Sequence, residues 1–140
     1  MIPDGMEANS VASFPDGSLV ATVPLHTGFA INEALAGRPT GAVHSWTPGA
    51  DAFVQIEGTE MPYANGIETS PDGREFYVAS SGLRQVLAFS NSNPARLLRR
   101  SSTFSIIPDN LHLGRGGKLL TAGMAVADSV CGDVALSLEF

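Results

Sequence analysis

The fold is decided by residues 64–79, which read ANGIETSPDGREFYVA. The middle of this stretch, Ser70 to Gly73, predicts a tight turn, because Pro fixes φ, Asp bonds to its own backbone and Gly accepts a positive φ. The aromatic and β-branched residues after the turn favour an extended chain. The stretch therefore predicts a strand, a turn and a second strand.

The same pattern occurs in two more places, and its three copies are in register. Asn9, Asn65 and Asp109 each stand eight residues before a turn glycine and two residues before an apolar residue. We call these three residues the anchors. They are 56 and 44 residues apart, close to the ~40–50 residues of a propeller blade.

We therefore predict an all-β protein whose residues 1–140 form one partial β-propeller domain of about three four-stranded blades, with 125–140 unassigned. An insertion at 25–40 separates strands of the first blade, and its residues 29–36 predict a short helix. The other elements are strands predicted at about 9–14, 18–24, 41–46, 52–56, 64–69, 76–79, 85–90 and 96–99, with the third blade from 106 to 124 and one more possible strand at 134–138.

Three blades are half of the commoner six-bladed ring. We expect the chain to be a fragment of a longer protein; closure by a second copy is the alternative. Open blade faces and unpaired strand edges favour self-association.

The composition excludes several classes of partner. A net charge of −6 and a pI near 4.8 argue against nucleic acid and anionic membranes, which attract basic surfaces. No apolar run approaches the ~20 residues of a membrane span, so a soluble protein is expected. A single cysteine, Cys131, excludes an internal disulfide. Cytoplasmic, periplasmic and secreted locations all stay open, because a targeting segment could precede Met1 in a longer parent chain.

The anchors are the candidate site residues. The innermost strands of a propeller line its axis, so Asn9, Asn65 and Asp109 are expected to meet in one funnel. Amide oxygens and a carboxylate are hard ligands that suit Ca²⁺ or another divalent cation such as Mg²⁺. The alternative is that each anchor only stabilises a turn or the start of a strand.

The residues Ala-Asn-Gly-Ile at 64–67, Ser-Pro-Asp-Gly at 70–73 and Pro-Asp-Asn-Leu at 108–111 resemble the senescence marker protein (regucalcin), gluconolactonase and paraoxonase-like superfamily of six-bladed propellers. The resemblance runs from about residue 5 to residue 124. It implies a divalent metal, usually calcium, that polarises the carbonyl of a lactone or ester.

By matched motif, the resemblance gives Asn65 and Asp109 the positions of metal ligands. Asn9 matches a metal ligand of paraoxonases, which in gluconolactonases contacts substrate or metal-bound water. Asn110 matches a further paraoxonase ligand. Asp109 is the only carboxylate at the anchors and is our candidate catalytic base. Glu7 departs from the pattern, because gluconolactonases often carry an arginine there for the sugar acid.

The leading hypothesis is thus a metal-dependent hydrolase of small-molecule lactones or esters, and the chain a fragment of the full enzyme. The family's first-blade glutamate ligand and the paraoxonase histidine pair belong to blades that this sequence does not contain. The alternative is a non-catalytic propeller that binds a partner, or an inactive truncated copy. His26, His44 and His112 share no ligand spacing, so surface or core roles are expected for them.

Overall fold

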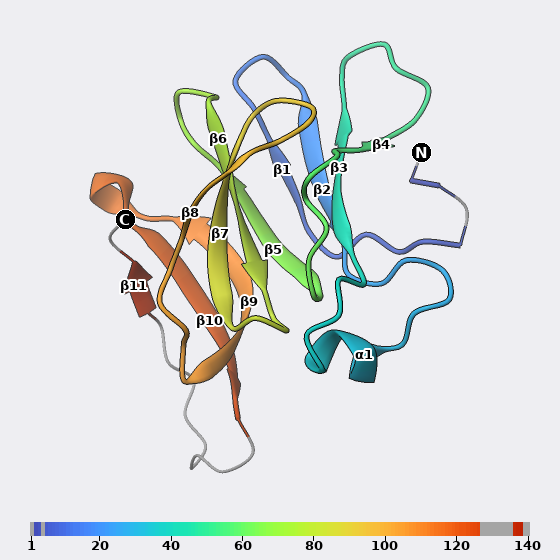
Figure 1. Ribbon diagram of the computed structural model, residues 1–140. Coiled ribbons are helices and arrows are strands. Elements are labelled where there is room, and N and C mark those ends of the chain that lie inside the picture. Colours follow the sequence, from blue (N-terminus) through green and yellow to red (C-terminus); the bar gives the residue numbers. More distant parts are fainter. Residues whose placement is uncertain (1, 4, 127–135, 139–140) are drawn as a thin grey trace.

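The computed structural model describes residues 2–3, 5–126 and 136–138 of the chain, and nearly all of their regular structure is β (Figure 1). The strands form three antiparallel sheets. The first sheet runs in chain order through β1 (Val11–Ser13), β2 (Leu19–Val23), β3 (Ala42–Trp46) and β4 (Val54–Gln55). The second runs through β5 (Ala64–Thr69), β6 (Glu75–Ser80), β7 (Gln85–Ser90) and β8 (Leu97–Arg100).

The third sheet contains β9 (Ile106–Leu113), β10 (Leu119–Ala125) and β11 (Leu136–Leu138), in the order β11-β10-β9. A 3₁₀ turn, η1 (Arg115–Gly117), joins β9 to β10. The predicted all-β fold of about three propeller blades is confirmed. The extra strand predicted at 134–138 is present at 136–138, where it pairs with β10; residues 134–135 and Cys131 lie outside the described residues.

The turn chemistry read from the sequence is also confirmed. Gly17, Gly73 and Gly117 have φ values of +85°, +71° and +75°, which L residues with a side chain rarely adopt. The predicted helix is present but shorter, as α1 (Ile31–Leu35), and Gly37 follows it with φ +85°.

The third blade begins at residue 106 as predicted, with β9. Its anchor, Asp109, lies three residues inside this strand, which begins at Ile106. Pro108 is tolerated within the strand because it lies opposite Gly123, beside a register shift between Thr121 and Gly123. Bulges of this kind are places where a residue without an N–H group fits in a sheet.

The blades are held together by two apolar clusters. The larger joins the first and second blades and includes Val20, Val43 and the stacked pair Phe76 and Phe89, whose ring centroids are 5.5 Å apart. The smaller joins the second and third blades, with Leu111 among its members. The faces that the blades turn toward one another are therefore mainly apolar.

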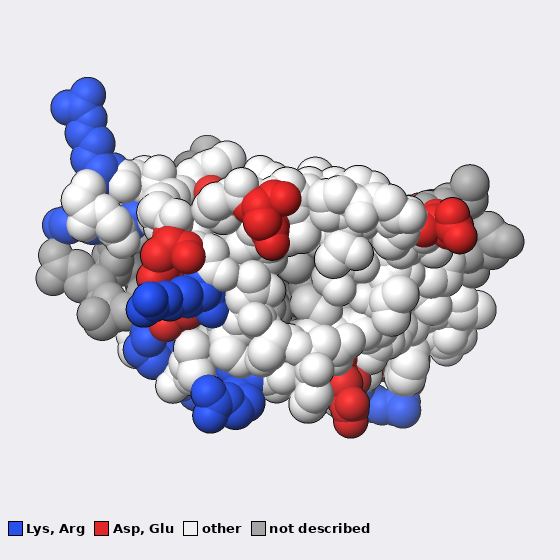
Figure 2. Space-filling model, turned by 90° about the horizontal axis from the view of Figure 1, so that it is seen from above, with Lys and Arg blue, Asp and Glu red and all other residues white. Residues whose placement is uncertain are grey.

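Charged residues are unevenly spread. Seven of the eight Lys and Arg residues lie between positions 74 and 118, and on the end of the molecule seen in Figure 2 they gather toward the second and third blades, among Asp and Glu side chains. Arg99 pairs with Glu75, and Arg74 lies 3.8 Å from Asp72. Within the described residues, no helix has the length and apolar character needed to cross a bilayer.

Candidate metal-binding and active site

Three anchors, one from each blade, line a single cavity of about 230 Å³. Asn9 precedes β1, Asn65 lies in β5 and Asp109 lies in β9. The structure therefore brings the three anchors together. The rest of the wall consists of two polar residues and four apolar ones: Tyr63, Ser81, Ile31, Leu35, Ile107 and Met124. We call this space the anchor cavity.

The side-chain amide of Asn65 is held in one orientation. Its Nδ2 donates to Ser81 Oγ at 3.0 Å, and the Ser81 hydroxyl donates to the Pro108 carbonyl at 2.7 Å. Because a serine has one hydroxyl hydrogen, Ser81 can only accept from Asn65. The amide oxygen Oδ1 of Asn65, a residue 8% exposed, is then left buried without a hydrogen-bond partner among the described residues.

The first two anchors share one bracing residue, Thr22 of β2. The backbone N–H of Asn9 donates to the Thr22 carbonyl at 2.9 Å, and the buried Thr22 hydroxyl donates to the Asn65 carbonyl at 2.5 Å. This pair of bonds fixes the spacing between the first and second blades at the level of the anchor cavity.

Gly66 explains the glycine of the Asn-Gly motif. A Cβ at this position would lie 2.4 Å from the Asp109 carbonyl oxygen and 2.6 Å from the Asn110 Cα. Both are backbone atoms, so they have little freedom to move aside. The absence of a side chain at Gly66 thus lets β5 approach β9, and it places Asn65 near Asp109.

The electrostatics of the anchor cavity are simple. Asp109, which is partly buried, is the one carboxylate among its lining residues. In the part of the chain that the structure describes, no three His, Cys, Asp or Glu residues are grouped so as to hold a metal ion. A cation in this cavity would therefore depend on amide oxygens as well as on Asp109.

The fourth proposed ligand, Asn110, is placed differently. It is exposed and is not among the residues that line the anchor cavity. Ile107 and Asp109 line it, and neighbouring residues in a strand face opposite sides. Of the four candidate ligands, the fold therefore brings Asn9, Asn65 and Asp109 to one cavity.

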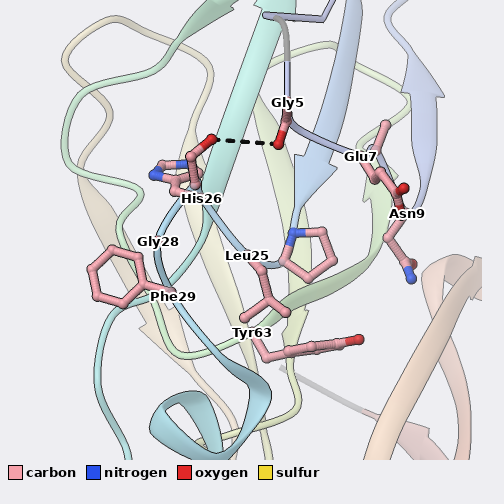
Figure 3. A pocket seen from close by; sticks show the side chains of 11 residues that line it. Gly5, Glu7, Asn9, Leu25, His26, Gly28, Phe29 and Tyr63 are labelled. Carbon is pink, nitrogen blue, oxygen red and sulfur yellow. Dashed lines mark hydrogen bonds between the residues drawn. The ribbon is translucent and has the colours of Figure 1, made fainter.

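A second cavity, of about 460 Å³, lies beside the first and shares Asn9 and Tyr63 with it. We call it the loop cavity. Figure 3 shows Asn9 and the Tyr63 hydroxyl at one end of it and His26 and Phe29 at the other. The N-terminal segment closes one side through the Thr27 hydroxyl, which donates to the Gly5 carbonyl at 3.4 Å. Glu7 also lines this cavity, where it supplies a negative charge instead of the arginine expected for a sugar acid.

Two histidines lie in contact at the loop cavity: His26, which lines it and is partly buried, and His44, which is buried. His26 and His44 make an edge-to-face contact with their ring centroids 5.6 Å apart. His26 Nε2 and His44 Nδ1 are buried and have no hydrogen-bond partner among the described residues. Burial lowers the pKa of His44 to about 4, with a smaller contribution from His26. Of the surface and core roles expected for the histidines, His44 has the core one, but with one ring nitrogen unsatisfied among the described residues.

Sequence reasoning did not find Thr22, Tyr63 or Ser81. Tyr63 directly precedes the Ala-Asn-Gly-Ile stretch at 64–67 and adopts φ +54°, a conformation that no sequence signal indicates for tyrosine. Thr22 and Ser81 act through bonds to residues 43 and 27 positions away. Such contacts follow only from the packing of whole blades.

Comparison with known proteins identifies the family. Residues 3–130 match the family model described as SMP-30/Gluconolactonase/LRE-like region. The chain belongs to this family. A search of curated proteins found no match to the chain.

Two solved structures have a similar fold. A luciferin-regenerating enzyme aligns with a TM-score of 0.59 at 17% identity, and a regucalcin from Agrobacterium tumefaciens, described as a calcium-binding protein, with 0.61 at 15%. Each alignment covers 84% of this chain but only 38% of the other protein. This chain thus spans well under half the length of these two proteins.

Proposed function

We propose that the protein is a calcium-dependent hydrolase of small-molecule lactones or esters, with its reacting centre in the anchor cavity. The observation that carries the proposal is the buried, unpartnered Oδ1 of Asn65. A buried amide oxygen without a hydrogen bond costs about 1–3 kcal/mol. That cost is removed if the oxygen binds a cation, and the description of the regucalcin as a calcium-binding protein supports the same choice of ligand.

The residues present fit such an ion. Asn9, Asn65 and Asp109 offer two amide oxygens and one carboxylate, the oxygen donors that Ca²⁺ takes. When bound, a divalent cation acts as a Lewis acid on a carbonyl oxygen and lowers the pKa of water. Asn65 would hold its oxygen in a fixed direction, because Ser81 and Pro108 fix its amide.

Asp109 has a second role in this proposal. Its carboxylate is the only one that lines the anchor cavity, so it is the group that can take the proton of attacking water as the carbonyl is attacked. Asn9, which lines both cavities, is suited to contact the substrate where the two spaces join.

A calcium titration of thermal unfolding tests the metal site. At a free Ca²⁺ concentration 100 times the Kd, binding only to the folded state stabilises by about 2.7 kcal/mol, or on the order of 5–10 °C for a domain of this size. Asp109→Asn should abolish most of this gain, because it removes the one anionic ligand. His112→Gln is the matched control on the same strand and should keep it. Equal gains in the two variants would refute the site.

A panel of lactones and aryl esters tests the reaction. Hydrolysis should require calcium and stop when a chelator is added, and Asp109→Ala should lower kcat/KM more than Asn65→Ala. The second candidate is a non-catalytic propeller that binds a partner, which the single carboxylate of the cavity favours. Calcium binding without chelator-sensitive hydrolysis of any panel member would select this second function.

A further inference from the structure

A third cavity, of about 410 Å³, adjoins the anchor cavity. Three residues line both spaces: Leu35, Ser81 and Ile107. The rest of the wall of the third cavity consists of Gly82, Arg84 and Val126. We call this space the arginine cavity, because Arg84 is the one charged residue among those that line it. A ligand held in the anchor cavity can therefore extend into the arginine cavity.

The charge of Arg84 is not neutralised by the protein. Arg38, Arg74 and Arg99 each lie beside a carboxylate, but in the part of the chain that the structure describes Arg84 has no ion pair. Of the eight Lys and Arg residues, all of which are described, Arg84 alone is partly buried and the other seven are exposed. A cation that is partly removed from water without a counter-ion is unfavourable, and a bound anion offsets that cost.

The backbone of Arg84 is held in an uncommon conformation. Arg84 has φ +54°, which glycine or asparagine would adopt more readily than arginine. Its N–H donates to the Ser81 carbonyl at 3.3 Å, and its carbonyl accepts from the Phe104 N–H at 2.8 Å. Strain of this kind persists only where the surrounding structure fixes the chain, and it is concentrated at functional sites. The two bonds fix the point from which the Arg84 side chain starts.

The turn that carries Arg84 also carries the residue that orients the anchor amide. This turn joins β6 to β7, and Figure 1 shows it at the same end of the molecule as α1. Within it, Ser81 accepts from Asn65 Nδ2. A Cβ on Gly82 would lie 2.4 Å from the Ala34 carbonyl oxygen, so the turn packs closely against α1. One well-packed turn therefore positions both the unpaired cation and the proposed ligand amide.

We infer that the arginine cavity binds a carboxylate group of the substrate, which is then a lactone or ester with a carboxylate substituent. This inference rests on the proposed hydrolase function and names its substrate class. Arginine presents a planar fork of N–H donors that matches the two oxygens of a carboxylate. A phosphate monoester would bring up to two negative charges, whereas the residues that line this cavity offer one positive charge. A single carboxylate is therefore the better match.

A charged lactone and its neutral counterpart test the subsite. The pair is the γ-carboxylate of γ-butyrolactone and the corresponding γ-carboxamide, which differ in charge and little in size. The carboxylate-to-carboxamide ratio of kcat/KM should fall about ten- to a hundredfold in Arg84→Met, the range of a hydrogen bond to a charged group. Arg84→Lys should keep part of the wild-type ratio, because the charge remains without the fork. Arg96→Met, at an exposed arginine of the same blade, is the matched control and should keep the whole ratio.

Calorimetric binding of glutaramate, the monoamide of glutarate, tests the subsite without turnover. This compound has one carboxylate and no ester, and a chelator in the buffer removes any contribution from calcium. Saturable binding that Arg84→Met weakens by about tenfold or more, and that Arg96→Met leaves unchanged, supports the subsite. The neutral diamide, glutaramide, should bind at least tenfold more weakly than glutaramate.

Three results would overturn the inference: no saturable binding of glutaramate, equal affinity in Arg84→Met and the wild type, or an unchanged kcat/KM ratio in Arg84→Met. Inorganic phosphate that binds more tightly than glutaramate, and that Arg84→Met weakens, would overturn the assignment to a carboxylate. If glutaramate binds through Arg84 but no lactone or ester is hydrolysed, the proposed hydrolase function fails while the carboxylate subsite stands.

Discussion

Acidification should destabilise the protein through His44, and the size of the effect follows from where this residue lies. His44 is 2% exposed in β3, between Ala21 of β2 and Gln55 of β4. Its pKa is lowered from 6.5 to about 4, mainly by burial and secondly by the neighbouring His26 ring. Burial also lowers the pKa of His26, and Glu60 opposes that shift.

The sign follows from the order in which the two states bind protons. Because the folded pKa lies below the ordinary value, the unfolded chain takes up the proton first as the pH falls. The stability associated with His44 is complete above about pH 6.5 and is lost progressively down to about pH 4. Each pKa unit corresponds to about 1.4 kcal/mol, so the loss across this window is about 3 kcal/mol.

Urea unfolding at a series of pH values between 7 and 4 measures this loss. His44→Leu should reduce the fall in unfolding free energy by about 3 kcal/mol relative to the wild type, because a buried leucine has no proton to bind. At pH 7 the same variant should differ from the wild type by less than about 1.5 kcal/mol, since the volume is similar and an unsatisfied nitrogen is removed. His112→Gln changes an exposed histidine and should retain the wild-type profile. The same profile in His44→Leu and wild type would refute the argument.

Two further variants test how the anchors are held. Gly66→Ala should destabilise the protein by about 1–3 kcal/mol or more, because its Cβ would meet the Asp109 carbonyl oxygen at 2.4 Å. Gly114→Ala should cost less in the same denaturant titration, because its Cβ would meet the Leu120 side chain at 3.2 Å and the Lys118 carbonyl oxygen at 3.3 Å, both longer contacts. Ser81→Ala should reduce the calcium-dependent rise in melting temperature by freeing the Asn65 amide, whereas the same change at the exposed Ser92 should not; an undiminished rise would show that the amide orientation is unimportant.

The blades could be predicted from sequence because their signals are local. A Pro-Asp-Gly turn and the alternation around it depend on a few consecutive residues, and three copies in register removed the ambiguity of any one copy. The helix and the turn glycines were predictable for the same reason. The bulge of the third blade was not, because Pro108 is accommodated opposite Gly123, and a sequence does not show which partner residue will bulge.

The candidate site was predictable only in its anchors. Equivalent positions in successive blades must face a common axis, so Asn9, Asn65 and Asp109 could be placed together without any model of the blades. The apolar half of the same cavity comes from α1, which belongs to the irregular insertion at 25–40 and has no counterpart in the repeat. Its packing against Gly82 is a contact between distant parts of the chain.

The Asn-Gly pair at 65–66 connects a local sequence motif with contacts between distant parts of the chain. Gly66 lets β5 approach β9, so the carbonyl of Pro108 comes within reach of Ser81, and Ser81 is then committed to that carbonyl. Because the Ser81 hydroxyl donates its one hydrogen to Pro108, it can only accept from the Asn65 amide nitrogen. The amide oxygen of Asn65 is then buried without a hydrogen-bond partner among the described residues. The residue with no side chain thus helps to set the orientation of the Asn65 amide, and a substitution at Gly66 should change ligand binding even though that residue offers no ligand atom of its own.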